Sequence, residues 1–379
     1  MLNIEIKKND IIEKLANIQS IVDKKSIATI LNNIFLYTNN DNLYLEVTDL
    51  EINYRTKIKS IIKEHGEITI NAKKIYELIR EFPCEDIFLQ ENENLWIRIT
   101  DGNNLDFKIG GLPPDDYPRF KELKKNNSIR IDSNILNEMI EKTIISVSLD
   151  ETKYNLIGLL FEYEKKDEKN IIRMVGSDGH KLSLVEKYLD ELDKNDFYEN
   201  ISFIIPKKGA QEIKKITEKN NKVMFGVDGK FCFVDTEDET LSIRLVDSKF
   251  PNYKSIIPKN RETIVKFDKN SMINSLKRVS IVMMDSSLKS VLLRIKNNNM
   301  EIETIEKEFG EAREKIEVDY MGNDIIIGLN TKLLISLLSV MKSQEVEMTI
   351  NGKNSPILLS GKDDKGFLGL VMPLTNLEG

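Results

Sequence analysis

The segment Ile70-Asn71-Ala72-Lys73-Lys74-Ile75-Tyr76-Glu77-Leu78-Ile79 decides the fold, because its pattern occurs three times along the chain. In each copy an apolar strand end leads through Asn or Pro into a lysine-led helix with apolar residues at helical spacing. The other copies are residues 205–213 and 329–338. Lys74 and Lys208 are 134 residues apart, and Lys208 and Lys332 are 124 apart, close to one third of the 379-residue chain. This period predicts three copies of one structural repeat.

A second helix is predicted in each repeat, at residues 9–22, 134–147 and 269–284, after a short apolar strand. Alternating apolar runs follow, and turn residues such as Asn39-Asn40-Asp41-Asn42 connect them as hairpins. The predicted fold class is therefore α+β, with two helices packed on antiparallel sheet in each of three repeated domains. Similar connectors at 111–120 and 247–253, where proline stands beside an aromatic residue, place the domains at 1–128, 129–256 and 257–379.

The composition excludes several classes of protein. With 40% hydrophobic and 31% charged residues the chain is typical of a globular protein. The N-terminus has charges where a signal peptide needs an apolar region, and the most apolar run, 333–341, is too short to span a bilayer, so we expect a soluble, cytoplasmic protein. Cys84 and Cys232 stand alone, and His65 and His180 are the only imidazoles, so no disulfide, metal site or cofactor is expected. No glycine-rich phosphate loop is present.

The charge is divided unevenly along the chain. The six predicted helical segments together carry +7, so the remainder of a chain whose formal net charge is −7 carries −14. One explanation is that lysine is a good helix former on solvated faces. The other is that all six helices face a common polyanion. The net charge itself argues against a protein that coats nucleic acid with its whole surface.

The turn Ser177-Asp178-Gly179-His180 contains the three residue types of a hydrolase catalytic triad. A triad needs a base that reaches the nucleophile and a third group that orients the base, which residues so close in one turn rarely arrange. The serine also directly follows a glycine, unlike the serine of G-x-S-x-G. We therefore expect that the protein is not an enzyme. Two alternatives stay open: a hydrolase that acts through Asp178 and His180, and a monomeric structural repeat protein that does not bind DNA.

Five short segments, in this order and spacing, resemble the bacterial DNA polymerase III beta subunit family, the sliding clamps. They are Thr48-Asp49-Leu50-Glu51-Ile52, Gly111-Leu112-Pro113 through Tyr117-Pro118, Ser177 to Leu182, Phe250-Pro251-Asn252-Tyr253 with Pro258-Lys259-Asn260, and Val371-Met372-Pro373-Leu374. The resemblance implies a head-to-tail homodimer whose six domains close a ring, with helices lining the hole, around duplex DNA of any sequence. It also implies a processivity factor that tethers the DNA polymerase III catalytic subunit, the clamp loader and repair proteins through short linear motifs.

The resemblance also implies functional positions. Lys25, Tyr154, Lys207 and Lys208 match residues that approach DNA, although Asn155 stands where a second aromatic residue can occur. Phe107 at one end, and Ile281 with Val282 at the other, match the subunit interface. The family's peptide-binding cleft lies between the second and third domains, and the matching positions are Leu156, Ser177, Gly179, His180, Lys181, Leu182, Pro251, Ser255, Ile256, Tyr320, Asn354, Pro356, Leu370, Val371, Met372, Pro373 and Leu374.

Three departures from the family pattern concern this cleft. Ser177 and Lys181 replace the usual threonine and arginine, which keeps a hydroxyl and a charge but loses the bidentate fork of arginine. Ser255 stands where another arginine is frequent, so the rim is expected to be less basic. Residues 375–379 extend past the usual end, and we expect them to trail into solvent.

Overall fold

The computed structural model describes residues 1–22, 28–166, 169–189, 197, 200–283, 289–305 and 310–375. Two helices occur in each repeat, as predicted, and their ends lie within four residues of the expected positions. The helices are α1 (Lys8–Ile18), α2 (Ala72–Glu81), α3 (Ser133–Ile144), α4 (Lys207–Thr217), α5 (Lys269–Ile281) and α6 (Thr331–Ser339). In the described part of the chain, no helix has both the length and the apolar character needed to cross a membrane.

The residues just before the helices explain where several of them begin. The Asn71 side chain accepts a hydrogen bond from the backbone N–H of Lys74, and Asn330 accepts from Lys332 and Leu333. Asp268 caps α5 in the same way. Such caps satisfy N–H groups that have no partner inside the helix, and each stabilises it by about 1 kcal/mol. The Asn that opens two of the three repeated segments is therefore the helix start signal.

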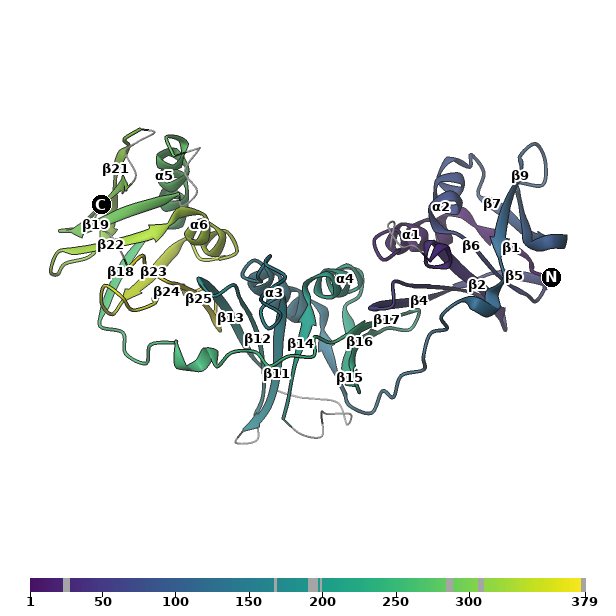
Figure 1. The fold of residues 1–379 in the computed structure, drawn as a ribbon, viewed down its shortest axis with the longest axis horizontal. Coiled ribbons are helices and arrows are strands. Elements are labelled where there is room, and N and C mark those ends of the chain that lie inside the picture. The colour runs from purple at the N-terminus through teal and green to yellow at the C-terminus, as the bar shows by residue number, and fades with distance from the viewer. Residues whose placement is uncertain are drawn as a thin grey trace. The chain divides into compact units, whose positions relative to one another are not determined.

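The strands form two antiparallel sheets, and each sheet belongs to one compact unit of the chain (Figure 1). The first unit comprises residues 1–133, 193–197 and 211–245, and the second comprises 134–192, 198–210 and 246–379. The first sheet contains β1 (Asn3–Lys7), β2 (Asn33–Asn39), β3 (Asn42–Thr48), β4 (Ile52–Lys59), β5 (Ile61–Glu64), β6 (Glu67–Asn71), β7 (Asp86–Asn92), β8 (Trp96–Thr100), β9 (Asp106–Leu112), β10 (Ser128–Asp132), β15 (Lys222–Asp228), β16 (Phe231–Asp235) and β17 (Glu239–Arg244).

The second sheet contains the remaining strands. They are β11 (Gly158–Lys166), β12 (Lys169–Ser177), β13 (Lys181–Leu189), β14 (Ile201–Pro206), β18 (Thr263–Asp268), β19 (Ser290–Lys296), β20 (Asn299–Thr304), β21 (Arg313–Asp319), β22 (Ile325–Asn330), β23 (Glu345–Ile350), β24 (Ile357–Ser360) and β25 (Phe367–Val371). The predicted hairpins β2–β3, β11–β12 and β19–β20 are confirmed.

Each unit is held together by strand pairing between repeats. In the first unit β17 pairs with β4, from Glu239 opposite Thr56 to Ile243 opposite Ile52. In the second unit β13 pairs with β25, from Lys181 opposite Val371 to Val185 opposite Phe367. The two compact units therefore follow the continuity of the sheets and cut through the middle repeat. The domain boundaries near residues 128 and 256 follow the repeats instead, and they stay a prediction.

The cores of the units lie between helices and sheet. In α1 the residues Ile11, Leu15 and Ile18 are buried, at the spacing of one helix face, and α1 packs against α2 and β4. In the second unit α5 packs against α6 and β18, and α6 also contacts β22 and β25. Burial of each large aliphatic side chain contributes about 1.5–3 kcal/mol, so these faces fix the helices on the sheets. The opposite sheet face near β13 remains available for the site described next.

Candidate functional site

The turn that joins β12 to β13 is built from its own side chains and from one glycine. Ser177 Oγ donates to the carbonyl oxygen of Lys181 at 2.9 Å, and Asp178 Oδ1 accepts the backbone N–H of both His180 and Lys181 at 2.8 Å. Gly179 has a φ of +92°, a conformation that residues with a Cβ rarely adopt. The glycine therefore permits the bend between the two strands.

These contacts bear on the hydrolase alternative. Ser177 and Asp178 are engaged with the backbone of the turn, so neither forms a hydrogen bond with the imidazole of His180, which is exposed. A nucleophile needs a base within about 2.6–3.2 Å that is itself oriented by a third group. The side chains of Asp178 and Ser177 therefore stabilise the backbone of the turn, through an Asx-type contact and a serine contact. Within the described residues, no group of three His, Cys, Asp or Glu side chains could hold a metal ion.

Lys181 corrects one expectation. We expected it to form a charged rim, but its side chain is buried and its Nζ donates to Ser336 Oγ of α6 at 2.9 Å. Burial lowers the pKa of Lys181. The reason is that successive side chains of a strand point to opposite faces of the sheet. Leu182 points to the face without helices, which we call the outer face, so Lys181 points toward the helices. Adjacent residues of one strand cannot both line the same surface.

The last strand, β25, forms the neighbouring wall. The backbone N–H of Met372 donates to the carbonyl of His180 at 2.8 Å, which extends the β13–β25 pairing to the turn. Leu182 lies opposite Leu370, and Lys181 lies opposite Val371. Leu370 and Met372 therefore share the outer face with Leu182, whereas Val371 faces inward and is fully buried.

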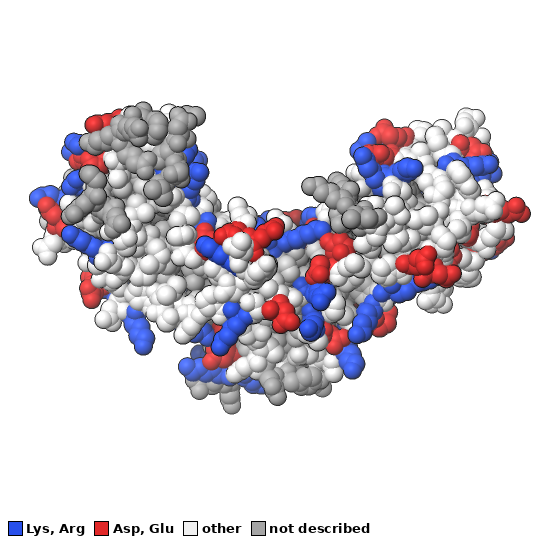
Figure 2. All heavy atoms as spheres, in the orientation of Figure 1, with Lys and Arg blue, Asp and Glu red and all other residues white. Residues whose placement is uncertain are grey.

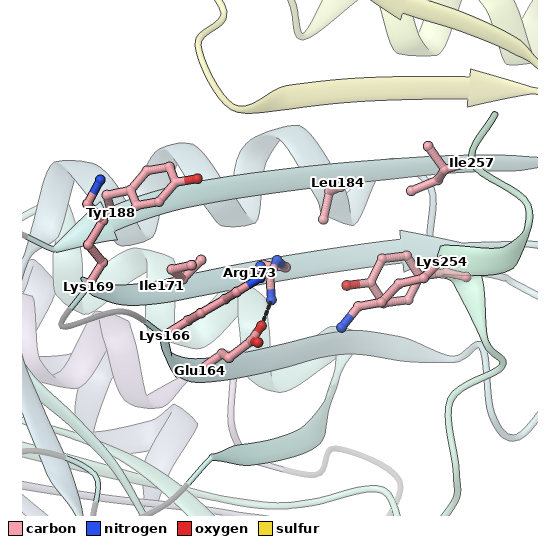
Figure 3. Close-up of a pocket in the computed structure, with 10 residues that line it drawn as sticks. Glu164, Lys166, Lys169, Ile171, Arg173, Leu184, Tyr188, Lys254 and Ile257 are labelled. Carbon is pink, nitrogen blue, oxygen red and sulfur yellow. Dashed lines mark hydrogen bonds and ion pairs between the residues drawn. The ribbon is translucent and has the colours of Figure 1, made fainter. Parts of the chain in front are cut away.

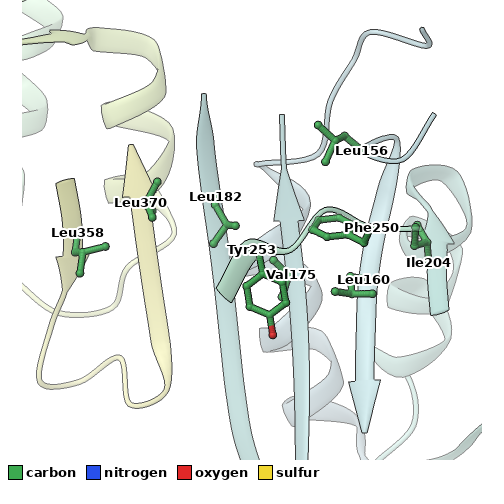
Figure 4. Close-up of a cluster of buried hydrophobic side chains, with 9 residues drawn as sticks. All are labelled: Leu156, Leu160, Val175, Leu182, Ile204, Phe250, Tyr253, Leu358 and Leu370. Carbon is green, nitrogen blue, oxygen red and sulfur yellow. The ribbon is translucent and has the colours of Figure 1, made fainter. Parts of the chain in front are cut away.

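An apolar cluster covers this outer face (Figure 4). Its members come from β11, β12, β13, β14, β24 and β25, from the loop before β11, and from the segment that follows β17. They are Leu156, Leu160, Val175, Leu182, Ile204, Phe250, Tyr253, Leu358 and Leu370, with Leu184, Val246, Ile257, Leu368 and Met372 packed against them. We call this set the outer apolar cluster.

The segment of residues 250–257 crosses the strands above the cluster (Figure 4). Phe250 and Tyr253 pack edge to face, with ring centroids 6.4 Å apart, and the Tyr253 hydroxyl donates to Glu162 at 2.5 Å. Burial and this hydrogen bond raise the pKa of Tyr253. The crossing segment is thus anchored by apolar contact on one side and by a charged acceptor on the other.

The structure brings most of the predicted cleft residues to this region. Leu156, Leu182 and Leu370 belong to the cluster, and Met372 packs against it. Pro251, Ser255 and Ile256 lie on the crossing segment and are exposed. Gly179 and His180 are exposed at the turn, Asn354 and Pro356 lie in the loop before β24, and Pro373 and Leu374 follow β25. Residues 376–379 lie outside the described residues, so the expectation that the C-terminal extension trails into solvent also falls outside them.

Among the predicted cleft residues, Lys181 and Val371 face the helices, and Tyr320 lies away from the set altogether. It follows β21, and β18, β23 and β24 stand between β21 and β25 in the sheet. Its hydroxyl donates to the carbonyl of Asn323 at 2.8 Å, so the side chain closes a local turn. Sequence reasoning missed Leu160, Val175, Ile204 and Leu358, because an apolar residue in a strand carries no local sign of the face it covers.

The predicted DNA-contacting residues are surface residues where they are described. Tyr154 is 70% exposed in the loop before β11, Lys207 is partly exposed at the start of α4, and Lys208 is exposed. Lys25 lies outside the described residues. On the face in Figure 2, Lys and Arg side chains are interspersed with Asp and Glu side chains.

Many basic side chains of the helices are already paired. Lys219 contacts Glu13 at 2.5 Å, Lys215 contacts Glu212 at 2.8 Å, and Lys142 of α3 is buried in contact with Glu138 and Asp364. Glu13, Glu212 and Glu138 are already counted in the helical sum of +7, so these pairs leave that sum unchanged and show only which lysines lie beside a carboxylate. That all six helices face one polyanion stays a prediction.

The predicted interface residues are apolar, and two of them, Phe107 and Ile281, are exposed, while Val282 is partly exposed. Phe107 of β9 is 41% exposed and its ring lies 5.8 Å from that of Phe82. Ile281 ends α5 and is 63% exposed, and Val282 follows it. Phe107 lies in the first compact unit, and Ile281 and Val282 lie in the second. Phe107 belongs to β9, and α5 packs on β21; both strands are paired along only part of one edge.

The geometry defines a class of protein: a three-domain α+β clamp fold with antiparallel sheets. Solved structures agree across the whole chain. The DNA polymerase III beta subunit of Thermotoga maritima matches with a TM-score of 0.89 and 26% identity, and the sliding clamp of Caulobacter crescentus with 0.91 and 26%; each alignment covers 99% of this chain and all of the other.

Sequence comparisons point the same way. Three family models of the DNA polymerase III beta subunit match: the N-terminal domain at residues 2–121, the central domain at 130–252 and the C-terminal domain at 254–375. The beta sliding clamp of Pseudomonas putida is 26% identical over 379 residues, covering 98% of this chain and 100% of that protein. The chain therefore belongs to the DNA polymerase III beta subunit family of sliding clamps, and its function is that of a DNA polymerase processivity factor.

Proposed function

We propose that two copies of this chain, each with domains at 1–128, 129–256 and 257–379, close head to tail into a ring around duplex DNA, with the helices toward the hole. The ring acts in the cytoplasm, catalyses no reaction and holds DNA without reading its sequence. The outer apolar cluster and its rim form the cleft in which the DNA polymerase III catalytic subunit, the clamp loader and repair proteins dock short linear motifs.

Two half-unpaired strands carry the proposal of a ring. Residues 106–110 of β9 pair with β8 only, since β6 reaches just Gly111 and Leu112. Residues 313–317 of β21 pair with β20 only, since β18 reaches just Val318 and Asp319. Each unit thus offers an open stretch of backbone in the middle of its sheet. Open edges of this kind are templates for pairing with another chain.

The side chains beside these edges differ, which favours a head-to-tail contact. Phe107 projects from β9, whereas Ile281 and Val282 lie at the end of α5, which packs on β21. One aromatic surface can then meet one aliphatic surface across each seam. Two different surfaces form a heterologous interface, which closes into a ring only when the rotation suits. A dimer satisfies both surfaces of both copies.

Contacts with DNA are expected to be loose. Lys207, Lys208 and Lys25 would contact phosphates, partly through water, and Tyr154 would add an exposed aromatic contact. Because these contacts go to phosphates and run partly through water, they do not read the sequence or fix the DNA in one register. The ring would therefore retain DNA by enclosure and leave it free to slide.

The cleft is supported by the arrangement of its parts. Leu182, Leu370 and Met372 share one face of the sheet, and the exposed Ile256 and His180 stand at its rim. Met372 and Leu374 are partly exposed beside the buried Leu182 and Leu370, and an apolar surface with an adaptable methionine suits the side chains of a short peptide.

The ring is tested by negative-stain electron microscopy of the purified protein, together with its mass by light scattering. We expect closed rings and a mass twice that of the 43.7 kDa chain. Particles with the mass of one chain at micromolar concentration would contradict the proposal and favour the monomeric repeat protein.

A further inference from the structure

A hollow of about 570 Å³ lies on the same sheet face as the outer apolar cluster, beside it (Figure 3). The two regions are continuous, because Tyr253 belongs to the cluster, Leu184 and Ile257 pack against it, and all three also line the hollow. Figure 3 shows Ile257 and Lys254 at one end, and Tyr188 and Lys169 at the other. A ligand in the cleft could therefore extend into the hollow without leaving the surface.

The strand register gives the hollow an ordered floor. Leu160, Val175 and Leu184 lie side by side across β11, β12 and β13, and the next row on this face is Glu162, Arg173 and Glu186. The third row is Glu164, Ile171 and Tyr188, and the last is the pair Lys166 and Lys169. The surface thus changes from apolar to charged and ends on two lysines at the hairpin tip.

The charged side chains of the middle rows are paired within the protein. Arg173 donates to Glu164 and to Glu186 at 2.5 Å each, and Lys254 lies 3.5 Å from Glu162. The hydrogen bond from Arg173 lowers the pKa of Glu164, and the charges of Lys254 and Lys166 act in the same direction. These three carboxylates and two cations sum to −1, so a ligand carboxylate is not expected to bind at these rows.

The lysine pair is different. Lys166 and Lys169 lie directly opposite each other in the β11–β12 hairpin, both are exposed, and neither forms an ion pair with a described residue. Like charges directly opposite in an antiparallel pair destabilise it. Asp167 and Glu168, which stand between the two lysines in the sequence, lie outside the described residues. Among the residues that line the hollow, Lys166, Lys169, Arg173 and Lys254 stand against Glu164, so the lining carries +3 and is complementary to negative charge.

We propose that the hollow binds acidic residues that flank the apolar anchor of a docking peptide, so that the peptide runs along β13 from the outer apolar cluster to Lys166 and Lys169. The inference rests on the proposed cleft. Leu184 and Tyr188 are four residues apart, or about 13 Å in a strand. An extended flank of about four to five residues would therefore bring a carboxylate to the lysines.

The test measures binding of fluorescein-labelled peptides to the full-length protein by anisotropy. Each peptide contains the docking segment of the same organism's DNA polymerase III catalytic subunit, with five added residues on one side. The added residues are rich in Glu, in Gln or in Lys, and versions are made for the N-terminal and the C-terminal side. We expect the Glu flank on one side to tighten binding about three- to tenfold over the Gln flank at low salt, and less at high salt.

Variants assign the effect to the hollow. Lys166→Gln with Lys169→Gln should abolish the preference for Glu and leave the affinity for the Gln-flanked peptide unchanged. Lys166→Glu with Lys169→Glu should reverse the preference toward the Lys flank. The matched control, Lys296→Gln with Lys362→Gln, removes two exposed lysines, of β19 and of the loop between β24 and β25, in the same unit and should behave as wild type.

The outcomes separate this inference from the proposed function. If all flanks bind equally, or if the lysine variants keep the preference, the inference is wrong and the cleft stands. If Met372→Ala leaves the binding of the Gln-flanked peptide unchanged, the peptide docks elsewhere, and both fail. If the lysine variants lose DNA retention while peptide affinities stay the same, the lysines contact DNA, and the inference is overturned.

Discussion

Asp364 shows how single residues hold the second unit together. It lies in the loop between β24 and β25, is fully buried, and accepts Lys142 Nζ of α3 at 2.7 Å and the backbone N–H groups of Lys342 and Ser343 at 2.9 and 2.8 Å. Burial alone would raise its pKa, but these hydrogen bonds lower the pKa of Asp364 to about 2. The carboxylate thus fixes a helix of the central repeat to a loop of the C-terminal repeat.

We expect Asp364→Asn to lower the free energy of unfolding by roughly 3 kcal/mol, because it leaves the buried Lys142 with Glu138 as its remaining carboxylate. A carboxyl whose pKa falls on folding stabilises the folded state above its unfolded pKa of about 3.9. That stability disappears as the pH falls through about 2. The difference between wild type and variant in urea unfolding should therefore shrink from pH 5 to pH 3.

The control is Asp363→Asn, which removes the neighbouring, exposed carboxylate. It should change the free energy of unfolding by less than about 0.5 kcal/mol. A difference between wild type and Asp364→Asn that stays constant with pH would contradict the assigned role.

At the residue scale, the sequence predicted the role of a side chain better than the face of the sheet to which it points. The bend at Gly179 and the apolar roles of Leu182 and Met372 follow from residue type. The inward orientation of Lys181 does not, because a strand buries alternate residues on opposite faces and the helix-facing side was not known. Tyr320 fails for a related reason, since its place depends on strands inserted between β21 and β25.

Among the elements, helices and hairpins were predictable and the pairing between repeats was not. Capping residues such as Asn71 and Asn330, and apolar spacing, are local signals that fix where a helix begins. The pairs β17–β4 and β13–β25 join strands that are far apart in the chain, and no local signal specifies them. The continuous sheets, and hence the division into two compact units, required the structure.

The open edge of β9 gives a prediction about assembly. Phe107→Asp should weaken the dimer by roughly thirtyfold or more, since a charged group would replace an aromatic residue that is buried on assembly. Analytical ultracentrifugation over a dilution series measures this change.

A matched variant separates this effect from a general loss of stability. Ile61 is 61% exposed on β5, the strand at one end of the same sheet, and is not part of the proposed seam. Ile61→Asp should leave the dissociation constant unchanged. Equal weakening by both variants would show that the seam is not at β9.

For the whole molecule, net charge alone could not predict the DNA-facing surface. The sequence separates basic helices from acidic strands and loops. It does not show which lysines lie beside a carboxylate of another element, as Lys219 lies beside Glu13 of α1. The distribution of charge over the surface therefore required the structure.

The most direct measurement of enclosure compares how long the protein stays on DNA of two topologies. The protein is loaded by its clamp loader onto nicked circular DNA, the loader is removed, and half of the sample is linearised with a restriction enzyme. We expect slow loss from the circle and rapid loss from the linear DNA, because a ring can slide off an end. Equal rates of loss from the two would show that the protein does not hold DNA by enclosing it.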